Sequence, residues 1–503
     1  MNEAARHAET ALVETGIQGL DDILGGGLTP HRLYLIEGDP GAGKTTLGLQ
    51  VLLAGHKRGE KGMYVSLSET REELLAVGQS HGWDLEGLPV TELAPAESSL
   101  TPEEENTMFH PSELELGETT KTVLQEVEQT RPRLVVFDSL SEMRLLAQNP
   151  LRYRRQILAL KQFFTGRQCT VLLLDDRTSE VTDLQLQSIA HGVISLERHS
   201  PEYGVMQRRL QILKMRGKPF RAGYHDYVIA MGGLRVFPRL VAAEHGTDFE
   251  AAQIKSGLAE LDALMDGGLE RGTSTLVMGP AGSGKSTLAT QYMVAAAARG
   301  ERGAFFLFEE SKKTLLARAA GLGQDVKGHL QAGRLTIRQV DPGEMSPGEF
   351  VHLVRYEVEQ GGAGMVMIDS LNGYLNAMPE ERFLTVQLHE LLTYLGQQGV
   401  VTLLVMAQHG LLGSAMQSPV DASYLADAVV LLRYFEAQGR LRRAVSVVKK
   451  RSGPHEAALR EFRLSSDGLH VGEPLEGFHG VLTGTPSLVR PGGDPSGGHN
   501  GGG

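Results

Sequence analysis

The chain has few of the residues on which several protein classes depend. It holds one cysteine, Cys169, among 503 residues. No intrachain disulfide can therefore form, and we expect a small buried side chain that fills space. No run of about 18 apolar residues occurs, so no membrane-spanning helix is expected. The first residues, MNEAARHAET, lack the apolar core of a signal peptide. These features favour a cytoplasmic protein.

Positive charge is also in short supply. Lys and Arg number 49 against 61 Asp and Glu, which gives a formal net charge of −12. An acidic chain is repelled by phosphate backbones at long range, so a nucleic-acid partner is disfavoured. Hydrophobic residues make up 41% of the chain, enough for packed cores, and the length predicts two to four domains.

What the chain does contain is a long internal repeat. Residues 15–47 match residues 256–288 without a gap, and Lys44 and Lys285 are 241 positions apart. Glu69 and Glu310 keep that spacing. A period of this length indicates duplication of a whole domain rather than a solenoid.

The repeat predicts three regions. We call residues 1–245 copy one and residues 246–485 copy two. Residues 486–503 are rich in Gly and Pro and are expected to be disordered. Copy one has about ten extra residues, which fall in the acidic stretch 96–119. We expect a solvated loop there, or a loop that docks a partner.

Within each copy, strand-like and helix-like patterns alternate. Apolar runs at 32–38, 62–69, 133–140 and 170–176 in copy one recur at 273–279, 303–310, 364–371 and 400–408 in copy two. Such uninterrupted runs are typical of parallel strands buried on both faces. The sequence therefore predicts an α/β fold with two tandem domains, each a mostly parallel sheet flanked by helices.

Each copy carries the phosphate-binding pattern G-x-x-x-x-G-K-[ST] between a strand and a helix. Glycines allow backbone N–H groups to converge on phosphate, the lysine reaches the terminal phosphates, and the hydroxyl binds Mg²⁺. The pattern predicts ATP and Mg²⁺ as cofactors. The residues are Gly38, Gly41, Gly43, Lys44, Thr45 and Thr46 in copy one, and Gly279, Gly282, Gly284, Lys285, Ser286 and Thr287 in copy two.

An aspartate ends a buried strand in each copy. Asp138 follows LVVF and Asp369 follows MVMI. A carboxylate at this place near the P-loop organises Mg²⁺ and its water, as a Walker-B aspartate does. The alternative is that each aspartate caps the helix that follows.

Carboxylates also follow the second strand. Copy two has Glu309 and Glu310, whereas copy one has Ser68 and Glu69. We expect one of these glutamates to activate the water that attacks ATP, and slower hydrolysis in copy one because serine is a poor base. Alternatively, the glutamates cap the next helix or form ion pairs.

A basic pair stands near the end of each copy, Lys214 with Arg216 and Lys449 with Arg451. In a strand, residues two apart share a face. Two cations on one face suit a γ-phosphate that is bound by a neighbouring subunit. The alternatives are a solvated basic edge strand and a nucleic-acid patch that includes Arg440, Arg442 and Arg443.

These motifs occur twice and in one order, and they resemble the KaiC family of RecA-superfamily ATPases, known from the cyanobacterial circadian clock. The resemblance covers about residues 13–485 and includes the endings ALREF and GVLTGTP. It implies RecA-like domains in an ATP-dependent homo-oligomer, a hexamer with nucleotide at the subunit interfaces. It also implies that Glu309 and Glu310 are catalytic and that Lys449 and Arg451 contact a γ-phosphate across the interface.

The resemblance further implies autophosphorylation in copy two. Ser423 matches the family's acceptor serine, but Tyr424 stands where a threonine is expected. An ordinary loop or cap serine is the alternative. Copy one also departs from the family at Ser68 and at Phe220, which replaces a histidine that copy two keeps as His455.

Three functions follow as hypotheses. The first is a KaiC-like ATPase that acts in signalling with an unidentified protein partner, with possible activity as a serine autokinase. The second is a nucleic-acid-dependent ATPase or recombination mediator like RecA or RadA. The third is a scaffold whose nucleotide state controls binding and whose turnover is negligible.

Overall fold

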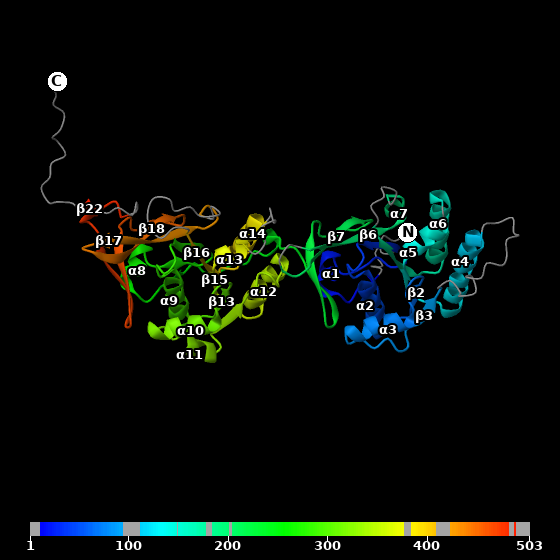
Figure 1. Ribbon diagram of the computed structural model, residues 1–503, viewed down its shortest axis with the longest axis horizontal. Coiled ribbons are helices and arrows are strands. Elements are labelled where there is room, and N and C mark those ends of the chain that lie inside the picture. Colours follow the sequence, from blue (N-terminus) through cyan, green and yellow to red (C-terminus); the bar gives the residue numbers. More distant parts are fainter. Residues whose placement is uncertain are drawn as a thin grey trace, which may run out of the picture. The chain divides into compact units, whose positions relative to one another are not determined.

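A computed structural model describes residues 11–93, 111–147, 149–177, 184–200, 204–376, 384–408, 423–481 and 487–488 (Figure 1). The chain divides into two compact units, Met1–Arg239 and Leu240–Gly503. This boundary lies a few residues before the one predicted after residue 245. Leu240 and Ala242 already pack in a hydrophobic core of the second unit.

The elements of the first unit are, in chain order, α1 (Gln18–Ile23), β1 (Leu33–Gly38), α2 (Lys44–Lys57), β2 (Gly62–Ser66), α3 (Arg71–Ser80), β3 (Val90–Glu92), α4 (Pro111–Thr130), β4 (Leu134–Asp138), α5 (Leu140–Ala147), α6 (Pro150–Gly166), β5 (Thr170–Asp176), α7 (Leu184–Ile189), β6 (Gly192–His199), β7 (Gln207–Met215), β8 (His225–Ala230) and β9 (Gly233–Phe237).

The elements of the second unit are η4 (Ala242–Glu244), β10 (Gln253–Ile254), α8 (Ala259–Leu264), β11 (Leu269–Glu270), β12 (Ser274–Gly279), α9 (Lys285–Ala298), β13 (Gly303–Leu307), α10 (Lys312–Gly321), α11 (Val326–Gln331), β14 (Leu335–Gln339), α12 (Pro347–Glu359), β15 (Met365–Asp369), α13 (Leu371–Asn376), α14 (Leu384–Gln397), β16 (Val401–Ala407), β17 (Ala428–Ala437), β18 (Arg440–Lys450), β19 (Arg460–Ser465), β20 (Gly468–Pro474), β21 (Phe478–His479) and β22 (Ser487–Leu488).

Each unit is built on one large sheet of nine strands. The strand order is β3-β2-β4-β5-β1-β6-β7-β8-β9 in the first unit and β14-β13-β15-β16-β12-β17-β18-β19-β20 in the second. The first six strands of each order pair in parallel, and the last three extend the sheet as antiparallel strands. Each copy is therefore a mostly parallel α/β domain, as the alternating pattern predicts.

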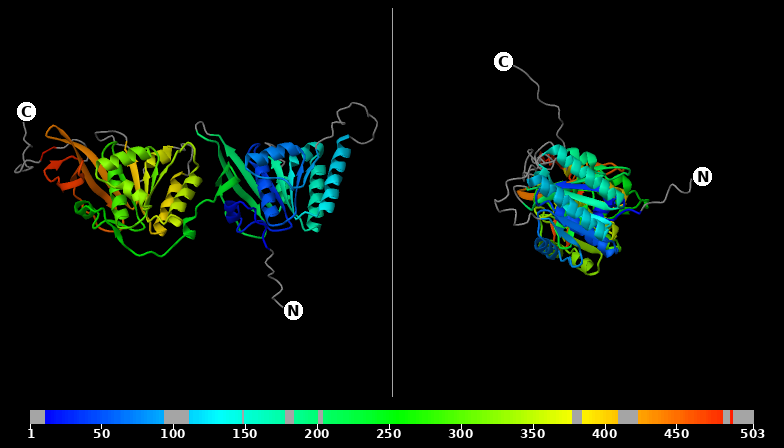
Figure 2. Two further views of the ribbon diagram at one scale, coloured as in Figure 1. Left: turned by 90° about the horizontal axis from the view of Figure 1, so that it is seen from below. Right: turned by 90° about the vertical axis from the view of Figure 1, so that its right-hand side faces the viewer.

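Alternate residues of the parallel strands enter two different cores. Leu35 of β1 lies in one hydrophobic cluster with Phe164 of α6, and its neighbour Ile36 lies in another with Val51 of α2. This follows because successive side chains of a strand point to opposite faces. Helices cover both faces of each sheet in Figure 2, and this burial on both sides explains why the strands read as continuous apolar runs.

The carboxyl ends of the central strands carry the motifs. The P-loop follows β1 and β12, which lie between other parallel strands in the middle of each sheet. In copy one, β5 separates β1 from β4, so the P-loop and Asp138 are two strands apart at one edge. This edge is where open α/β sheets bind ligands.

Two expectations are wrong in part. Residues 111–119 of the predicted acidic loop form the first half of α4, and 96–110 lie outside the described residues. The expected disordered tail contains β22, whose Ser487 and Leu488 pair with β21. The rest of that tail is outside the described residues. Both errors come from composition, which does not reveal a helix or a strand that longer-range pairing stabilises.

The scarce residue types behave as expected. Cys169 is a free buried cysteine in a hydrophobic cluster, and burial raises the pKa of its thiol to about 12. The prediction of a small buried side chain that fills space is therefore confirmed. Among the described residues, no helix combines the length and the apolarity that crossing a membrane requires.

Candidate functional site

Both P-loops place a left-handed glycine directly before a helix. Gly43 precedes α2 with φ +98°, and Gly284 precedes α9 with φ +102°. This left-handed φ is strained for other residues, and a Cβ on Gly43 would also lie 2.5 Å from Ile229 Cδ1, so glycine is strongly favoured there. Neither helix has a side-chain cap at its first turn. The free N–H groups and the positive end of each helix are therefore open to an anion such as phosphate.

The two P-loop lysines are buried and held by carbonyl oxygens of their own loops. Lys44 Nζ donates to the carbonyls of Gly38 and Asp39, each at 3.0 Å. Lys285 Nζ donates to the carbonyl of Pro280 at 2.8 Å. Burial lowers the pKa of Lys285 below its ordinary value, although the charges of Asp369 and Glu309 oppose this. Each ammonium is thus positioned over the cradle that a phosphate would fill.

In copy one, the P-loop hydroxyl meets the strand-end carboxylate. Thr45 Oγ1 donates to Asp138 Oδ2 at 2.8 Å, although the two residues are 93 positions apart. Tyr64 donates to the same oxygen at 2.5 Å. Burial raises the pKa of Asp138, and the hydrogen bonds from Tyr64 and Thr45 oppose that rise. Asp138 is therefore in direct contact with the P-loop hydroxyl.

Copy two has the same pair without the tyrosine. A hydrogen bond from Ser286 lowers the pKa of Asp369, which burial raises overall. Phe305 occupies the position of Tyr64, 241 residues later. Within the described residues, Asp369 Oδ2 is buried and has no hydrogen-bond partner.

These groups fit a hydrated Mg²⁺ ion. Hard divalent cations prefer oxygen ligands, and Mg²⁺ in nucleotide sites uses one or two protein oxygens beside phosphates and waters. An orphaned, buried carboxylate oxygen such as Asp369 Oδ2 is costly unless a ligand completes it. The described residues hold no cluster of three His, Cys, Asp or Glu side chains suited to a metal. A hydroxyl, one carboxylate and the nucleotide are thus the fitting ligand set.

The glutamates after the second strand do not cap the next helix. Thr70 caps α3 in a capping box with Glu73, and Ser311 caps α10. Glu309 is exposed at the strand end. Glu69 is half-buried, and its Oε2 is buried without a hydrogen-bond partner in the part of the chain that is described.

The environments of Glu69 and Glu310 differ. Burial raises the pKa of Glu69 to about 7, with further contributions from the charges of Asp138 and Glu73. Glu310 instead forms an ion pair with Arg318 at 2.7 Å. The residue of copy one that matches Arg318 is Val77, 241 positions earlier. The ion-pair alternative therefore holds for Glu310 and not for Glu69.

Each basic pair stands at the end of an interior strand. Lys214 belongs to β7 and Lys449 to β18, and Arg216 and Arg451 follow the ends of these strands. β7 runs between β6 and β8, and β18 runs between β17 and β19, so the alternative of a basic edge strand is wrong. Lys214 and Arg216 share one face, since both donate to the carbonyl of Ser188, at 3.2 Å and 2.9 Å.

The pair in copy two holds the segment that contains Ser423. Lys449 Nζ donates to the carbonyls of Ser423 and Ala426 at 2.8 Å and 2.7 Å. Arg451 Nη2 donates to the carbonyl of Tyr424 at 2.7 Å. These cations therefore fix the backbone of a turn in their own subunit. Ser423 is half-buried, and Tyr424 is 53% exposed.

Phe220, where copy one lacks the histidine of the family pattern, is an apolar residue. Phe220 packs against a hydrophobic cluster of the first unit, whereas His455 is half-buried. Phe220 thus contributes to the fold of copy one and brings no polar group to the site.

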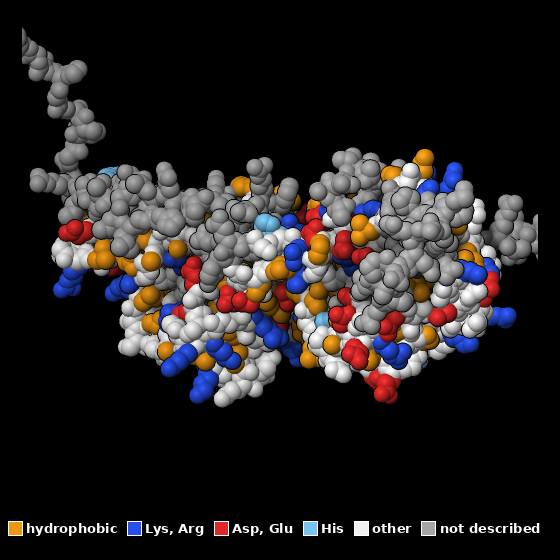
Figure 3. Space-filling model, turned by 45° about the vertical axis from the view of Figure 1, so that its right-hand side comes forward, with side chains coloured by type: hydrophobic (Ala, Val, Ile, Leu, Met, Phe, Trp, Pro, Cys, Tyr) orange, Lys and Arg blue, Asp and Glu red, His pale blue; other side chains and the backbone are white. Residues whose placement is uncertain are grey.

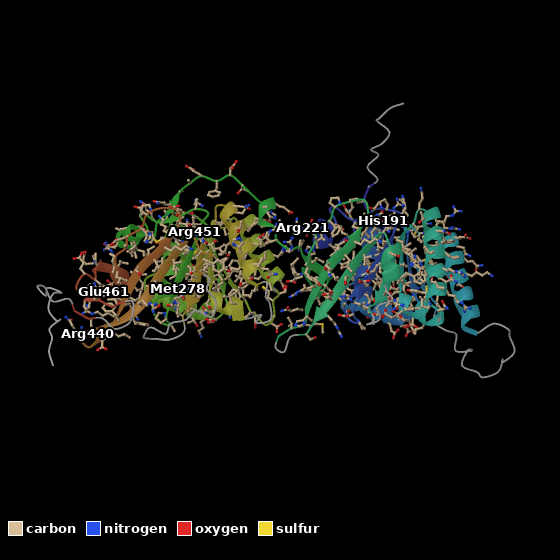
Figure 4. The ribbon with its side chains drawn as sticks, turned by 90° about the horizontal axis from the view of Figure 1, so that it is seen from above. His191, Arg221, Met278, Arg440, Arg451 and Glu461 are labelled. Atoms are coloured by element: carbon tan, nitrogen blue, oxygen red, sulfur yellow. The ribbon has the colours of Figure 1, made fainter. Side chains whose placement is uncertain are left out.

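The two groups of basic residues suggested for a nucleic-acid patch are separate. Arg440 begins β18 and Arg451 follows its end, as Figure 4 shows. Eleven residues of strand span about 36 Å, so Arg440 and Arg451 do not belong to one continuous basic surface. Arg442 also approaches Glu461 to 3.6 Å. On the coloured part of the face in Figure 3, side chains of both signs are interspersed.

Three partners of the site are missing from the sequence-based prediction. They are Tyr64, Arg318 and Asp176, and none of them belongs to a motif recognised in the sequence. Asp176 pairs with Lys44 at 2.7 Å. The repeat itself contains the missing signal. Comparison at the constant spacing shows Tyr64 against Phe305 and Arg318 against Val77.

Comparisons with known proteins agree with this geometry. A family model described as "ATPase: KaiC" matches residues 13–241 and 254–476. The chain is 27% identical over 478 residues to circadian clock protein KaiC3 of Synechocystis sp., which covers 94% of each chain. It is 26% identical over 493 residues to circadian clock oscillator protein KaiC of Synechococcus elongatus, which covers 97% of this chain and 94% of the relative. The chain therefore belongs to the KaiC family of ATPases.

Proposed function

We propose that the protein hydrolyses MgATP at both P-loops, in a homo-oligomer that acts in signalling through its nucleotide state. One observation carries this proposal: Thr45 of the P-loop meets Asp138 of β4 at 2.8 Å. A hydroxyl and a carboxylate from distant parts of the chain then face the same point beside a phosphate cradle. That pairing is what Mg²⁺-dependent phosphoryl transfer requires.

The P-loop and strand-end residues would have separate roles in ATP hydrolysis. Mg²⁺, held by Thr45 and Asp138 or by Ser286 and Asp369, would neutralise charge on the phosphate oxygens. Lys44 and Lys285 bind the terminal phosphates, and the amides at the start of α2 and α9 cradle them. Thr46 and Thr287, the next residues of these helices, complete the phosphate contacts.

A carboxylate must then orient the attacking water. In copy two we assign this to Glu309, because Arg318 engages Glu310 while Glu309 is exposed. In copy one we assign it to Glu69, since its buried carboxyl has a pKa of about 7, near the value that suits a general base. Ser68 supplies no second carboxylate, so hydrolysis in copy one is slower.

The oligomer is part of the proposal. Arg216 and Arg451 stand at the surface with side chains that reach backbone carbonyls. In a ring, these cations and the adjacent Lys214 and Lys449 would serve the γ-phosphate of a neighbouring subunit. The resemblance favours a hexamer, with an unidentified protein as the partner that reads the nucleotide state.

A finer proposal concerns Ser423. Lys449 and Arg451 hold its segment by three carbonyl oxygens, which gives the serine a defined place. Such order suits a phosphoacceptor in copy two, although Tyr424 replaces the family's second acceptor. The relatives are named for the circadian clock. For this chain the proposal stops at regulation by ATP turnover and single-site phosphorylation.

The test is to incubate the protein with Mg²⁺ and γ-labelled ATP, and to follow free phosphate and protein-bound label together. We expect free phosphate from both copies and a protein label that Ser423→Ala removes. Free phosphate without label would leave an ATPase and remove the kinase. Retained ATP without hydrolysis would favour a nucleotide-gated scaffold, and stimulation by DNA would favour a nucleic-acid motor.

A further inference from the structure

The P-loop lysine of copy one has a carboxylate partner. Lys44 Nζ lies 2.7 Å from Asp176 Oδ1, and the lysine side chain is 8% exposed against 37% for the aspartate. The carbonyls of Gly38 and Asp39 accept the other hydrogen bonds of this ammonium. A lysine ammonium has three donors. All three are therefore occupied by the protein itself.

The sheet places Asp176 at the phosphate cradle. Asp176 ends β5, and its Cα partner across the parallel ladder is Gly38, the first residue of the P-loop. Its charge also contributes to the raised pKa of Asp138. The residue thus lies between the P-loop and the strand that carries Asp138.

A neighbouring hydroxyl anchors the backbone of Asp176. Ser141 Oγ of α5 accepts from the backbone N–H of Asp176 at 3.3 Å. The same hydroxyl donates to Asp175 Oδ1 at 3.0 Å and lies 3.5 Å from Asp176 Oδ2. α5 therefore fixes the end of β5, where the Asp176 carboxylate meets Lys44.

Copy two lacks this carboxylate. The strand register pairs Gly279 with Ala407, just as Gly38 pairs with Asp176. Asn372 braces the end of β16 through both backbone groups of Ala407, as Ser141 braces β5. Among the ion pairs of the described residues, none joins Lys285 to a carboxylate, and its donor contact is the Pro280 carbonyl.

We propose that Asp176 sets the nucleotide affinity of copy one by competing with the nucleotide phosphates for Lys44. This rests on the proposed function, because it requires Lys44 to bind phosphate. A nucleotide that enters copy one must displace an anion from the ammonium, whereas one that enters copy two displaces a neutral carbonyl. The Asp176 carboxylate then remains close to the bound phosphates and repels them.

The expected effect is moderate, because Asp176 is partly exposed to solvent. The free energy of a partly exposed ion pair such as Lys44–Asp176 corresponds to about a three- to tenfold change in a binding constant. Copy one therefore binds nucleotide more weakly than copy two. Either Asp176→Asn in copy one or Ala407→Asp in copy two should reduce this difference in affinity.

The experiment is calorimetric titration with MgADP and with a non-hydrolysable ATP analogue at one site at a time. Lys285→Ala leaves copy one as the binding site, and Asp176→Asn is added to it. Asparagine keeps the shape of the side chain but removes its charge. We expect the affinity of copy one to rise about three- to tenfold and its dependence on salt to change.

The reciprocal variant uses copy two. In a Lys44→Ala background, Ala407→Asp should weaken nucleotide binding by a similar factor, because Ala407 is half-buried and leaves room at the strand end. Thermal melting of each variant shows that its fold is kept. This arm tests the idea even if Asp176→Asn destabilises the first unit.

The outcomes separate the inference from the proposal beneath it. Unchanged or weaker binding in Asp176→Asn, while Lys44→Ala still abolishes binding in copy one, would overturn the competition and leave the nucleotide site intact. Binding in copy one that survives Lys44→Ala would overturn both.

Discussion

Arg318 donates hydrogen bonds to both carboxylate oxygens of Glu310, from Nη2 at 2.7 Å and from Nε at 3.2 Å. A third donor, Nη1, lies 3.3 Å from Thr287 Oγ1 in the P-loop helix. Arg318 thus fixes Glu310 against α9 and neutralises its charge. Copy one has Val77 at this place, and Glu69 is left with a raised pKa.

This arrangement predicts unequal roles for the two glutamates of copy two. With copy one disabled by Lys44→Ala, Glu309→Gln should lower the turnover number by about 10²–10⁴, the usual contribution of a general base. Glu310→Gln should lower it less, because Arg318 already engages that carboxylate. Single-turnover hydrolysis measures both. A larger loss from Glu310→Gln would show that Arg318 positions the catalytic carboxylate.

The hydrogen bond from Tyr64 to Asp138 predicts that the two copies require different Mg²⁺ concentrations. Its hydroxyl occupies the same Asp138 oxygen that Thr45 contacts, whereas Asp369 Oδ2 has no partner among the described residues. Tyr64→Phe should therefore lower the Mg²⁺ concentration for half-maximal turnover in copy one by about tenfold, the lower end of the range for changes to partners of metal ligands.

Phe305→Tyr is the matched control for that measurement. It should raise the Mg²⁺ requirement of copy two. If Tyr64→Phe instead raises the requirement of copy one, Tyr64 orients the metal-binding carboxylate and does not compete with the ion.

His225 predicts acid sensitivity of the first unit. The ring is buried, accepts from the Arg239 N–H at 2.9 Å and contacts the Arg221 carbonyl at 3.0 Å. Burial lowers its pKa from 6.5 to about 4. The folded ring stays neutral where the unfolded ring binds a proton. Its contribution is complete above pH 6.5 and is lost as pH falls towards 4, by up to about 3 kcal/mol.

The measurement is urea unfolding of the first unit's transition at about pH 7 and about pH 4.5, with His225→Gln as the comparison. Glutamine supplies a donor and an acceptor but does not titrate. The stability of the unaltered protein should fall about 2–3 kcal/mol more than that of the variant over this range. Equal falls in both proteins would contradict the assignment.

Lys449 and Arg451 should differ in how much each contributes to the stability of the second unit. Lys449→Met leaves the carbonyls of Ser423 and Ala426 without their donor and should destabilise the second unit by about 1–3 kcal/mol. Arg451→Ala should lower the stability of the second unit less, because the Arg451 side chain is 53% exposed.

Turnover gives the second readout for this pair. If Arg451 serves a neighbouring γ-phosphate, Arg451→Ala should lower turnover in the assembled protein by about 10³ or more with little change in melting temperature. Normal turnover in Arg451→Ala would leave both cations as supports for the turn at Ser423–Ala426.

The sequence predicts the two domains, the P-loops and Asp138 and Asp369, because these depend on local patterns and on a repeat of constant spacing. It does not predict the antiparallel extension of each sheet, β7–β9 and β18–β20, because register across strands is a long-range property. The same limit applies to Tyr64, Asp176 and Arg318. Each acts through a contact that no local motif specifies: Tyr64 with Asp138, Asp176 with Lys44, and Arg318 with Glu310.

The most direct test of the whole account is the number of nucleotides retained per chain after gel filtration in MgATP. Because each copy has its own P-loop lysine, the unaltered protein should retain two, and Lys44→Ala and Lys285→Ala should each retain one. The double variant should retain none. Retention of two nucleotides in either single variant would show that the P-loops are not the binding sites and would contradict the account.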